Sequence, residues 1–458
     1  SSWSSSWLMA TGLVAVTLPF LAKDLLRRRR IARATEAGAK RIDLLPSECS
    51  PIIRQSPPTT TVTFFLGDWR KAEAKLASKV AEIVRANPWL ESTLEEANCW
   101  GKGLVAFYPA GAVGSKPCFS VRSDLTVKRI VSGTSKLGDY NALVDSVKDV
   151  VCKTTDESVG RALPLWRVTL LPRVAGDPSG RCFALVVSAN HSLMDGHGFY
   201  RLHNMLSEGA PVEALNPQRN FQVPERMLAL QGGEPSLFAQ CPPGFLLRFL
   251  WGTVRNAVLK ETEAMGFHPS PDFIARAKAR AEGSKHGFVS TNDVLVSSFC
   301  SALRCDLAMM AMNFRGRAEG CGEHDVGNYE DLISYAPADY RSPEQIRESV
   351  HSAPFTRAGG GKLPTNAGHL QATYGAVTNW ATFAKTVDLG AGGKQDLHLP
   401  LFDWNKSTPA SVVGAMVIFR PNEGKLGVLC AGSRAAMRRV MQCGDGTGTL
   451  CGEPILTS

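Results

Sequence analysis

The most informative stretch of this chain is NHSLMDGHG at residues 190–198, which directly follows an apolar run at 182–188. The run, CFALVVS, predicts a buried strand, so His191 stands where that strand ends. A strand holds an imidazole rigidly at a cleft, where its neutral Nε2 can take a proton from a nucleophile. We therefore predict a general base at His191. Asp195 is expected to turn away from the substrate and fix the loop through a cation, and Gly196 to permit the angles of a tight turn.

Helical and strand patterns alternate on both sides of this motif. Residues 69–87 form an amphipathic helical pattern that stops at Pro88, with Ala72, Leu76, Val80, Ile83 and Val84 on one stripe. Further helices are expected at 244–260 and 292–310. Strands are expected at 61–66, 104–108, 118–121, 165–171, 182–188, 311–314, 374–380, 412–419 and 426–429. The interleaving predicts an α/β (α+β) class.

Length and composition predict two domains. The chain has 458 residues, of which 44% are hydrophobic and 20% charged, so a disordered, collagen-like or coiled-coil chain is excluded. We expect an N-terminal domain that carries HxxxDG and a C-terminal domain, joined by a Pro/Gly-rich crossover. The predicted segments are 1–41 (membrane anchor or targeting segment with a basic flank), 42–60 (linker), 61–206 (N-terminal domain), 207–243 (crossover) and 244–458 (C-terminal domain).

Charge and cysteine content exclude several kinds of partner. The net charge is +9, but residues 1–41 contribute +6 of it, with eight Lys and Arg against two acidic residues, which leaves +3 for the rest. The folded body is nearly neutral, so nucleic acid is not an expected partner. The twelve cysteines are scattered without a CxxC pair or zinc spacing. They are expected to be buried small side chains in a reducing compartment, and no metal is expected.

The N-terminal twenty residues from Trp3 to Ala22 carry no charge. As a helix they would cover roughly 30 Å, about one hydrocarbon core. The basic block KDLLRRRR at 23–30 follows, so the positive-inside rule predicts a single-pass anchor with the rest of the chain on the cytosolic or stromal side. A remnant of an organelle-targeting presequence is the alternative. The apolar helix at 244–260 belongs either to the core or to a membrane interface, and the sequence leaves both open.

HxxxDG after a strand resembles the signature of the CoA-dependent acyltransferase superfamily. That superfamily includes chloramphenicol acetyltransferase, condensation domains of nonribosomal peptide synthetases, wax ester synthases and the BAHD acyltransferases. Further segments resemble BAHD-like and alcohol O-acyltransferase-like members in the same order: STNDVL at 290–295, NFRGR at 313–317 followed by GN at 327–328, VTNW at 377–380 and VDLGAG at 387–392. The resemblance implies two chloramphenicol-acetyltransferase-like domains with mixed sheets, here preceded by the anchor helix.

The resemblance also implies how the motif works. His191 would deprotonate a hydroxyl or an amine, which attacks the thioester of acyl-CoA in a ternary complex without a covalent enzyme intermediate. Acyl-CoA is then a co-substrate, and no cofactor is permanently bound. Asp195 would point away from the substrate and pair with an arginine, for which Arg315 is the candidate. Gly196 and Arg315 would thus support the site structurally.

Two other segments carry implied roles. Thr378, Asn379 and Trp380 match positions that face the acceptor alcohol, whereas Asp388 and Gly390 match a loop that shapes the second domain near the CoA channel. In some family members a tryptophan of that loop donates a hydrogen bond to the developing oxyanion, but this chain has Ala391 there. Loss of one such donor costs about 2.7–4 kcal/mol of transition-state stabilisation. Either Thr378, Asn379 or Ser192 replaces this donor, or the enzyme is slow.

The function that these motifs predict is an acyl-CoA-dependent O-acyltransferase that makes an ester from a hydrophobic alcohol. The rival is a weakly active or inactive protein that keeps the fold as an interaction or structural subunit, which the missing tryptophan and the unusual anchor favour. A condensation-type enzyme that forms amides on a carrier protein finds less support, since these residues include no carrier domain. The sequence has no GxxxxGK[ST], GxSxG or HExxH motif.

Overall fold

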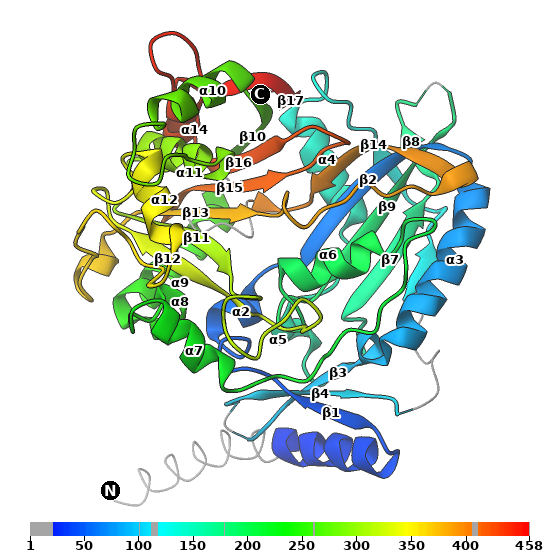
Figure 1. Cartoon of the computed structure of the whole chain (residues 1–458). Coiled ribbons are helices and arrows are strands. Elements are labelled where there is room, and N and C mark those ends of the chain that lie inside the picture. Colours follow the sequence, from blue (N-terminus) through cyan, green and yellow to red (C-terminus); the bar gives the residue numbers. More distant parts are fainter. Residues whose placement is uncertain are drawn as a thin grey trace, which may run out of the picture.

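The strand that precedes the HxxxDG motif lies in the middle of a five-stranded mixed sheet. The structure is a computed structural model, which describes residues 22–99, 101–110, 118–177, 179–259, 262–404 and 411–457. The strand order of this sheet is β14-β2-β9-β7-β5, with the motif strand as β9 (Figure 1). We call this sheet and its helices the first lobe. The strands are β2 (Thr59–Gly67), β5 (Phe119–Val121), β7 (Trp166–Leu171), β9 (Cys182–Ala189) and β14 (Gly393–Pro400).

The second lobe is built on a seven-stranded mixed sheet of order β12-β11-β13-β15-β16-β10-β17. β13 runs parallel to both β11 and β15, and the other neighbours are antiparallel. The mixed sheets agree with the prediction. The strands are β10 (Thr262–Pro269), β11 (Leu307–Asn313), β12 (Glu330–Tyr335), β13 (Tyr374–Asn379), β15 (Val412–Phe419), β16 (Gly427–Ser433) and β17 (Cys451–Leu456).

Helices cover both faces of the seven-stranded sheet, because successive side chains of a strand point to opposite faces. In β11, Ala308 and Met310 belong to the apolar cluster of one face, whereas Leu307 and Met309 belong to the cluster of the other. The first face is covered by α10 (Pro271–Arg280), α11 (Thr291–Leu303), α12 (Pro343–His351) and α14 (Arg434–Met441). The second is covered by α8 (Leu237–Gln240) and α9 (Pro243–Leu259).

Smaller elements complete the chain. A three-stranded sheet of order β1-β4-β3 lies below the first lobe in the view of Figure 1, and β6 pairs with β8. The remaining strands are β1 (Lys40–Asp43), β3 (Thr93–Glu96), β4 (Leu104–Tyr108), β6 (Thr126–Lys128) and β8 (Arg173–Ala175). The remaining helices are α2 (Pro51–Gln55), α3 (Trp69–Ala86), α4 (Leu137–Val147), α5 (Thr155–Ser158), α6 (Gly196–Asn204), α7 (Val223–Leu230) and the 3-10 turns η1 (Pro88–Glu91), η2 (Gly368–Leu370) and η3 (Gly390–Gly392).

The amphipathic stripe of α3 confirms the sequence prediction. The predicted apolar residues are its buried residues, and the Asp68 side chain accepts a hydrogen bond from the Arg70 backbone at its N-terminus. The predicted helix at 292–310 is wrong in its second half. Arg304 takes a left-handed conformation (φ 55°) that ends α11, and the apolar run that follows forms β11. Short apolar runs are ambiguous between helix and strand without tertiary context.

The chain of the second lobe returns to the first lobe through β14. This strand pairs antiparallel with β2, so residues 393–400 extend the sheet built by residues 59–189. The predicted domain boundaries near residues 206 and 243 stay a prediction. The first lobe contains residues from both parts of the chain, because β14 follows most of the second lobe in sequence. Residues 42–60, predicted as a linker, contain α2 and the fully buried Glu48.

Residues 22–36 form a helix that lies outside the two lobes, at the blue end of the chain in Figure 1. The predicted membrane span at 3–22 lies, apart from Ala22, outside the described residues and stays a prediction. Among the helices that the structure does describe, none is both long enough and apolar enough to cross a membrane.

The close contact between Gly392, just before β14, and helix α3 can be tested by substitution. A Cβ added at Gly392 would lie 2.8 Å from the Ala72 Cα, so Gly392→Ala must push η3 away from α3. We expect it to lower the free energy of unfolding by about 1–3 kcal/mol in urea denaturation, as overpacking does. Gly283→Ala is the control, because a Cβ there meets nothing within 4 Å. An equal effect of both substitutions would contradict the tight contact.

Candidate active site

The His191 imidazole is held by one side-chain hydrogen bond between the lobes. Its Nδ1 lies 3.1 Å from Oδ1 of Asn328, in the loop before β12. The Asn328 Nδ2 donates to the His191 carbonyl at 2.8 Å, which fixes the orientation of the amide. Because Oδ1 only accepts, Nδ1 of the neutral ring carries the proton and Nε2 keeps its lone pair. The ring is half-buried, and Nε2 has no hydrogen-bond partner among the described residues.

Asn328 is itself held by a buried ion pair that the sequence analysis did not find. Its backbone N–H donates to Oε1 of Glu48 at 2.8 Å. The Glu48 carboxylate accepts from Nε of Arg219 at 3.1 and 3.2 Å, and both side chains are fully buried. Arg219 also donates to the carbonyl of Leu193, inside the HxxxDG loop, at 2.7 Å. Glu48, Arg219 and Asn328 thus connect three distant segments to the loop of His191.

Asp195 makes the predicted ion pair with Arg315. The distances are 2.7 Å from the Arg315 Nη1 to Oδ2 and 3.2 Å from Nη2 to Oδ1, and both side chains are buried. The carboxylate also accepts from the backbone of Gly198, where it caps α6, and from that of Tyr329. Burial opposes ionisation, but Arg315 and these hydrogen bonds outweigh it, so the pKa of Asp195 is lowered. Its oxygens therefore face Arg315 and backbone N–H groups.

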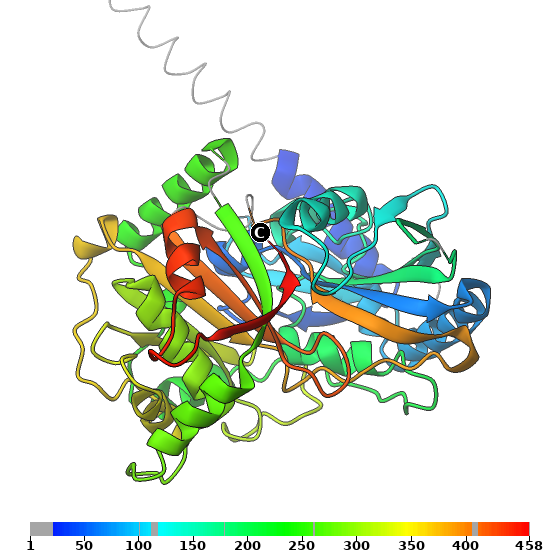
Figure 2. The ribbon, with the colours of Figure 1, turned by 90° about the horizontal axis from the view of Figure 1, so that it is seen from above.

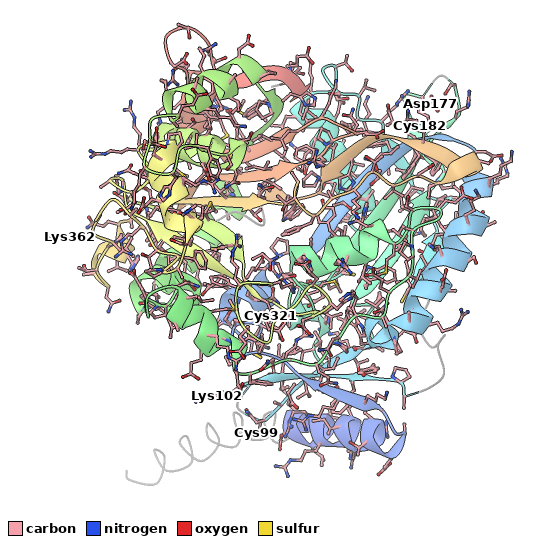
Figure 3. All side chains as sticks on the ribbon, viewed as in Figure 1. Cys99, Lys102, Asp177, Cys182, Cys321 and Lys362 are labelled. Carbon is pink, nitrogen blue, oxygen red and sulfur yellow. The ribbon has the colours of Figure 1, made fainter. Side chains whose placement is uncertain are left out.

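Arg315 is oriented by further acceptors on its own loop. It donates to the carbonyls of Asp325 and Gly327 and to Oδ1 of Asn313. Figure 3 labels Cys321 on the same loop, near the middle of the molecule, where burial raises the pKa of its thiol to about 12. A loop of the second lobe is thus folded around a guanidinium that reaches the first lobe.

Other buried polar side chains fix the turn at His191. The Oδ1 of Asn190 accepts from the Ser192 backbone at 3.0 Å and from the Thr155 hydroxyl at 2.9 Å. The Ser192 hydroxyl donates to the Glu48 carbonyl at 2.9 Å and is fully buried. Ser192 is therefore engaged and does not stand free as the predicted oxyanion donor. Asn190 has a structural role in this turn.

Gly196 has a different physical role from the predicted one. Its φ is not positive, so the turn does not require glycine. A Cβ there would instead lie 3.3 Å from Nε1 of Trp380, so glycine allows the indole to lie against the motif. The Trp380 ring also contacts the rings of Tyr200 and Phe402, with centroids 6.0 and 5.5 Å away. The structure thus places Gly196 of the first lobe against Trp380 of the second, and both were predicted as site residues.

The two residues before Trp380 differ in their surroundings. The Nδ2 of Asn379 donates to Oδ1 of Asn292 at 2.9 Å, and its Oδ1 accepts from the backbone of Ala381. Both ends of this amide are engaged within the second lobe. Thr378 is half-buried near the end of β13, and its hydroxyl has no partner among the described residues. A role of either residue in binding an acceptor stays a prediction.

Asp388 and Gly390 lie at the entry to β14, beside α3 at the edge of the molecule (Figure 1). Asp388 accepts from the Gly390 backbone at 2.8 Å, and its carbonyl accepts from the Glu208 backbone. Gly390 has a φ of +54°, and a Cβ there would collide with the Glu208 carboxylate. Ala391 is exposed on this loop. The segment supports the return of the chain into β14, and the effect of Ala391 on the reaction stays a prediction.

Two further titratable groups lie near the ion pair, and the sequence pattern did not indicate either. Nε2 of His197 donates to the Glu323 carboxylate at 2.8 Å. Burial, then the charge of Arg315, lower the pKa of His197. It lines a cleft of about 550 Å³ beside α6. Burial and the negative charge of Asp195 raise the pKa of Glu330 above its ordinary value, against the opposing charge of Arg315. Perturbed groups of this kind cluster at functional sites.

Comparison with solved structures gives the same architecture. TRI101 of F. graminearum, in complex with coenzyme A and T-2 mycotoxin, aligns with a TM-score of 0.57 at 14% identity, covering 91% of this chain and 100% of that one. The first condensation domain of the CDA synthetase aligns with a TM-score of 0.52 at 15% identity, covering 90% and 98%. This chain has the fold of the CoA-dependent acyltransferases. No protein-family profile and no curated protein sequence matches it.

The shared fold confirms the resemblance drawn from HxxxDG and the ordered segments around it. Among the described residues, no group of three or more His, Cys, Asp or Glu side chains is placed to hold a metal ion.

The ion pair of the motif allows a second test. Asp195→Asn leaves the Arg315 guanidinium buried without a counter-charge, and we expect a loss of about 3–5 kcal/mol in the free energy of unfolding. Asp43→Asn, in the exposed pair with Arg41, is the control and should cost at most about 1 kcal/mol. Both are measured by urea denaturation at pH 7.

The pH dependence has a defined sign. Because folding lowers the pKa of Asp195 from 3.8, its stabilising charge is present above that value and is lost as the pH falls below it. The difference in free energy of unfolding between wild type and Asp195→Asn should therefore become smaller at acid pH. A loss no larger than that of the control at pH 7 would contradict the assigned role of the pair.

Proposed function

We propose that this chain is an acyltransferase that moves an acyl group from a CoA thioester to the hydroxyl of an alcohol. Nε2 of His191 takes the proton of the hydroxyl while its oxygen attacks the thioester carbonyl carbon. The tetrahedral intermediate expels the CoA thiolate, which takes the proton from the imidazolium. The products are an ester and free CoA, and the imidazole ends as it began.

The observation that carries this proposal is the hydrogen bond between His191 Nδ1 and Asn328 Oδ1. It sets the tautomer that a general base needs, and it costs nothing at the moment of reaction because the ring is already oriented. Two solved structures with this fold support the choice of substrates, since TRI101 was crystallised with coenzyme A and with T-2 mycotoxin or deoxynivalenol.

The proposed acceptor is a hydrophobic alcohol, with Thr378 and Trp380 beside it. Trp380 lies against Gly196 and packs with Tyr200 and Phe402, so an aromatic surface adjoins the motif loop. Apolar acceptor carbon would be sheltered from water there, which strengthens the electrostatic interactions of the reaction. The Thr378 hydroxyl is the donor that we assign to the developing oxyanion, since Ser192 and Asn379 are engaged elsewhere.

The test replaces the base. We expect His191→Ala to lower kcat/KM by about 10²–10⁴-fold, the contribution typical of general-base catalysis. Release of CoA is followed by chromatography over a panel of acyl-CoAs and of short and long alcohols. His351→Ala, at the exposed end of α12, is the matched control and should keep wild-type turnover. Wild-type rates in His191→Ala, or a wild type that transfers to no alcohol of the panel, would contradict the proposal.

A further inference from the structure

Helix α9 presents an apolar face to the outside of the molecule. Of the fourteen large hydrophobic side chains that are exposed among the described residues, six lie on this one helix. Their exposed fractions range from 41% for Leu250 to 73% for Val258. A surface helix of a soluble protein normally shows the reverse pattern, with its polar residues outward. The six exposed hydrophobic residues of α9 are Leu247, Leu250, Trp251, Val254, Val258 and Leu259.

The exposed side chains form one continuous stripe. At 100° per residue, Leu250, Trp251, Val254 and Val258 fall within an arc of about 100° that includes Leu247. The opposite side of the helix packs on the protein, where Phe245 and Asn256 are 1% and 2% exposed. The helix is therefore anchored through one face and leaves the other, equally apolar, face in water. Leu370 of the adjacent η2 is also exposed.

Charged groups flank this stripe in the pattern of a membrane-surface helix. Arg248 and Arg255 fall together at one edge of the arc, 80–100° from Leu247 by the same count of 100° per residue. Arg255 is exposed, whereas Arg248 is half-buried and its Nε is covered by the protein. The stripe contains no acidic residue. An amphipathic helix that lies in a bilayer interface combines an apolar face with basic residues that reach the anionic headgroups.

The helix at 22–36 lies on the same side of the molecule. Figure 2 shows α9, in green, and the start of that helix, in blue, along the upper edge of the view. Leu25 and Leu26 are 50% and 53% exposed, and Arg29 and Arg33 of the same helix are exposed as well. Two elements far apart in sequence, each with exposed apolar and basic residues, thus lie along one side of the molecule.

We propose that this side of the molecule binds to the surface of an anionic lipid bilayer. The α9 stripe enters the boundary between headgroups and acyl chains, with the helix parallel to the membrane plane. Arg255 and the exposed basic residues of the 22–36 helix contact lipid phosphates. A lipid surface fits better than a protein groove, since the stripe is flanked by basic groups and is shared between two separate helices.

The experiment measures partition of the full chain onto vesicles by flotation. The vesicles contain phosphatidylcholine alone or phosphatidylcholine with phosphatidylserine. The test variant carries Leu247→Ser, Trp251→Ser and Val254→Ser. The control carries Phe221→Ser, Phe288→Ser and Met441→Ser, three exposed positions of other elements. All six residues are exposed, from 41% for Met441 to 67% for Trp251, so both variants should fold, which circular dichroism and thermal unfolding check.

We expect the wild type and the control to bind the anionic vesicles more tightly than the neutral ones. The α9 variant should lose about tenfold or more in partition coefficient, because three apolar side chains no longer enter the interface. Its rate of CoA release with a short, water-soluble alcohol should stay unchanged, which separates this inference from the proposed activity. Partition of the α9 variant equal to that of the control, or no binding of the wild type, would overturn the proposal.

Oxidative footprinting of Trp251 in the full chain identifies other occupants of the stripe. The proposal expects Trp251 to be oxidised without vesicles and protected with them. Protection without vesicles at every protein concentration would show that another segment of the same chain covers the stripe. Protection that grows with protein concentration would show that a second copy does so. Either result would overturn the lipid assignment.

Discussion

The buried ion pair between Asp195 and Arg315 is the interaction on which the site depends. It joins the loop that follows β9 in the first lobe to the loop that follows β11 in the second. Such a pair adds little net stability, because both charges are removed from water, but breaking it leaves a charge unpaired. It therefore selects one arrangement of the two loops. Asn328 lies on the loop that Arg315 orders, so the pair also places the partner of His191.

The buried ion pair between Glu48 and Arg219 also holds loops next to His191 in place. It fixes the backbone of Asn328 and the carbonyl of Leu193, two groups on the loops next to His191. The His191 imidazole is therefore oriented by a single side-chain hydrogen bond, to the amide of Asn328, and its Nε2 stays available to a substrate. Buried polar networks of this kind are expected to be rigid when every member is satisfied.

Local pattern and resemblance predicted the parts of the fold that have a local signal. The α3 stripe follows from helical periodicity, and His191 follows from its place after an apolar run. Arg315 was found only because it stands in a segment that resembles the family. Glu48, Arg219 and β14 were not predicted, because their partners lie far away in sequence and no spacing reports them. The helix at 244–260 was left between core and membrane interface, and α9 has one face in the core and one exposed.

The central claim is that Asn328 holds His191 as the neutral tautomer with the proton on Nδ1. Nitrogen-15 NMR of the histidine-labelled protein, with His191 assigned from the spectrum of His191→Ala, reports this directly. At a pH where the ring is neutral, we expect the shifts of a protonated Nδ1 and an unprotonated Nε2 in the wild type. In Asn328→Ala the two tautomers should mix, because the acceptor for Nδ1 is gone. A wild-type proton found on Nε2 would contradict the account, since that ring nitrogen could not accept one from an alcohol.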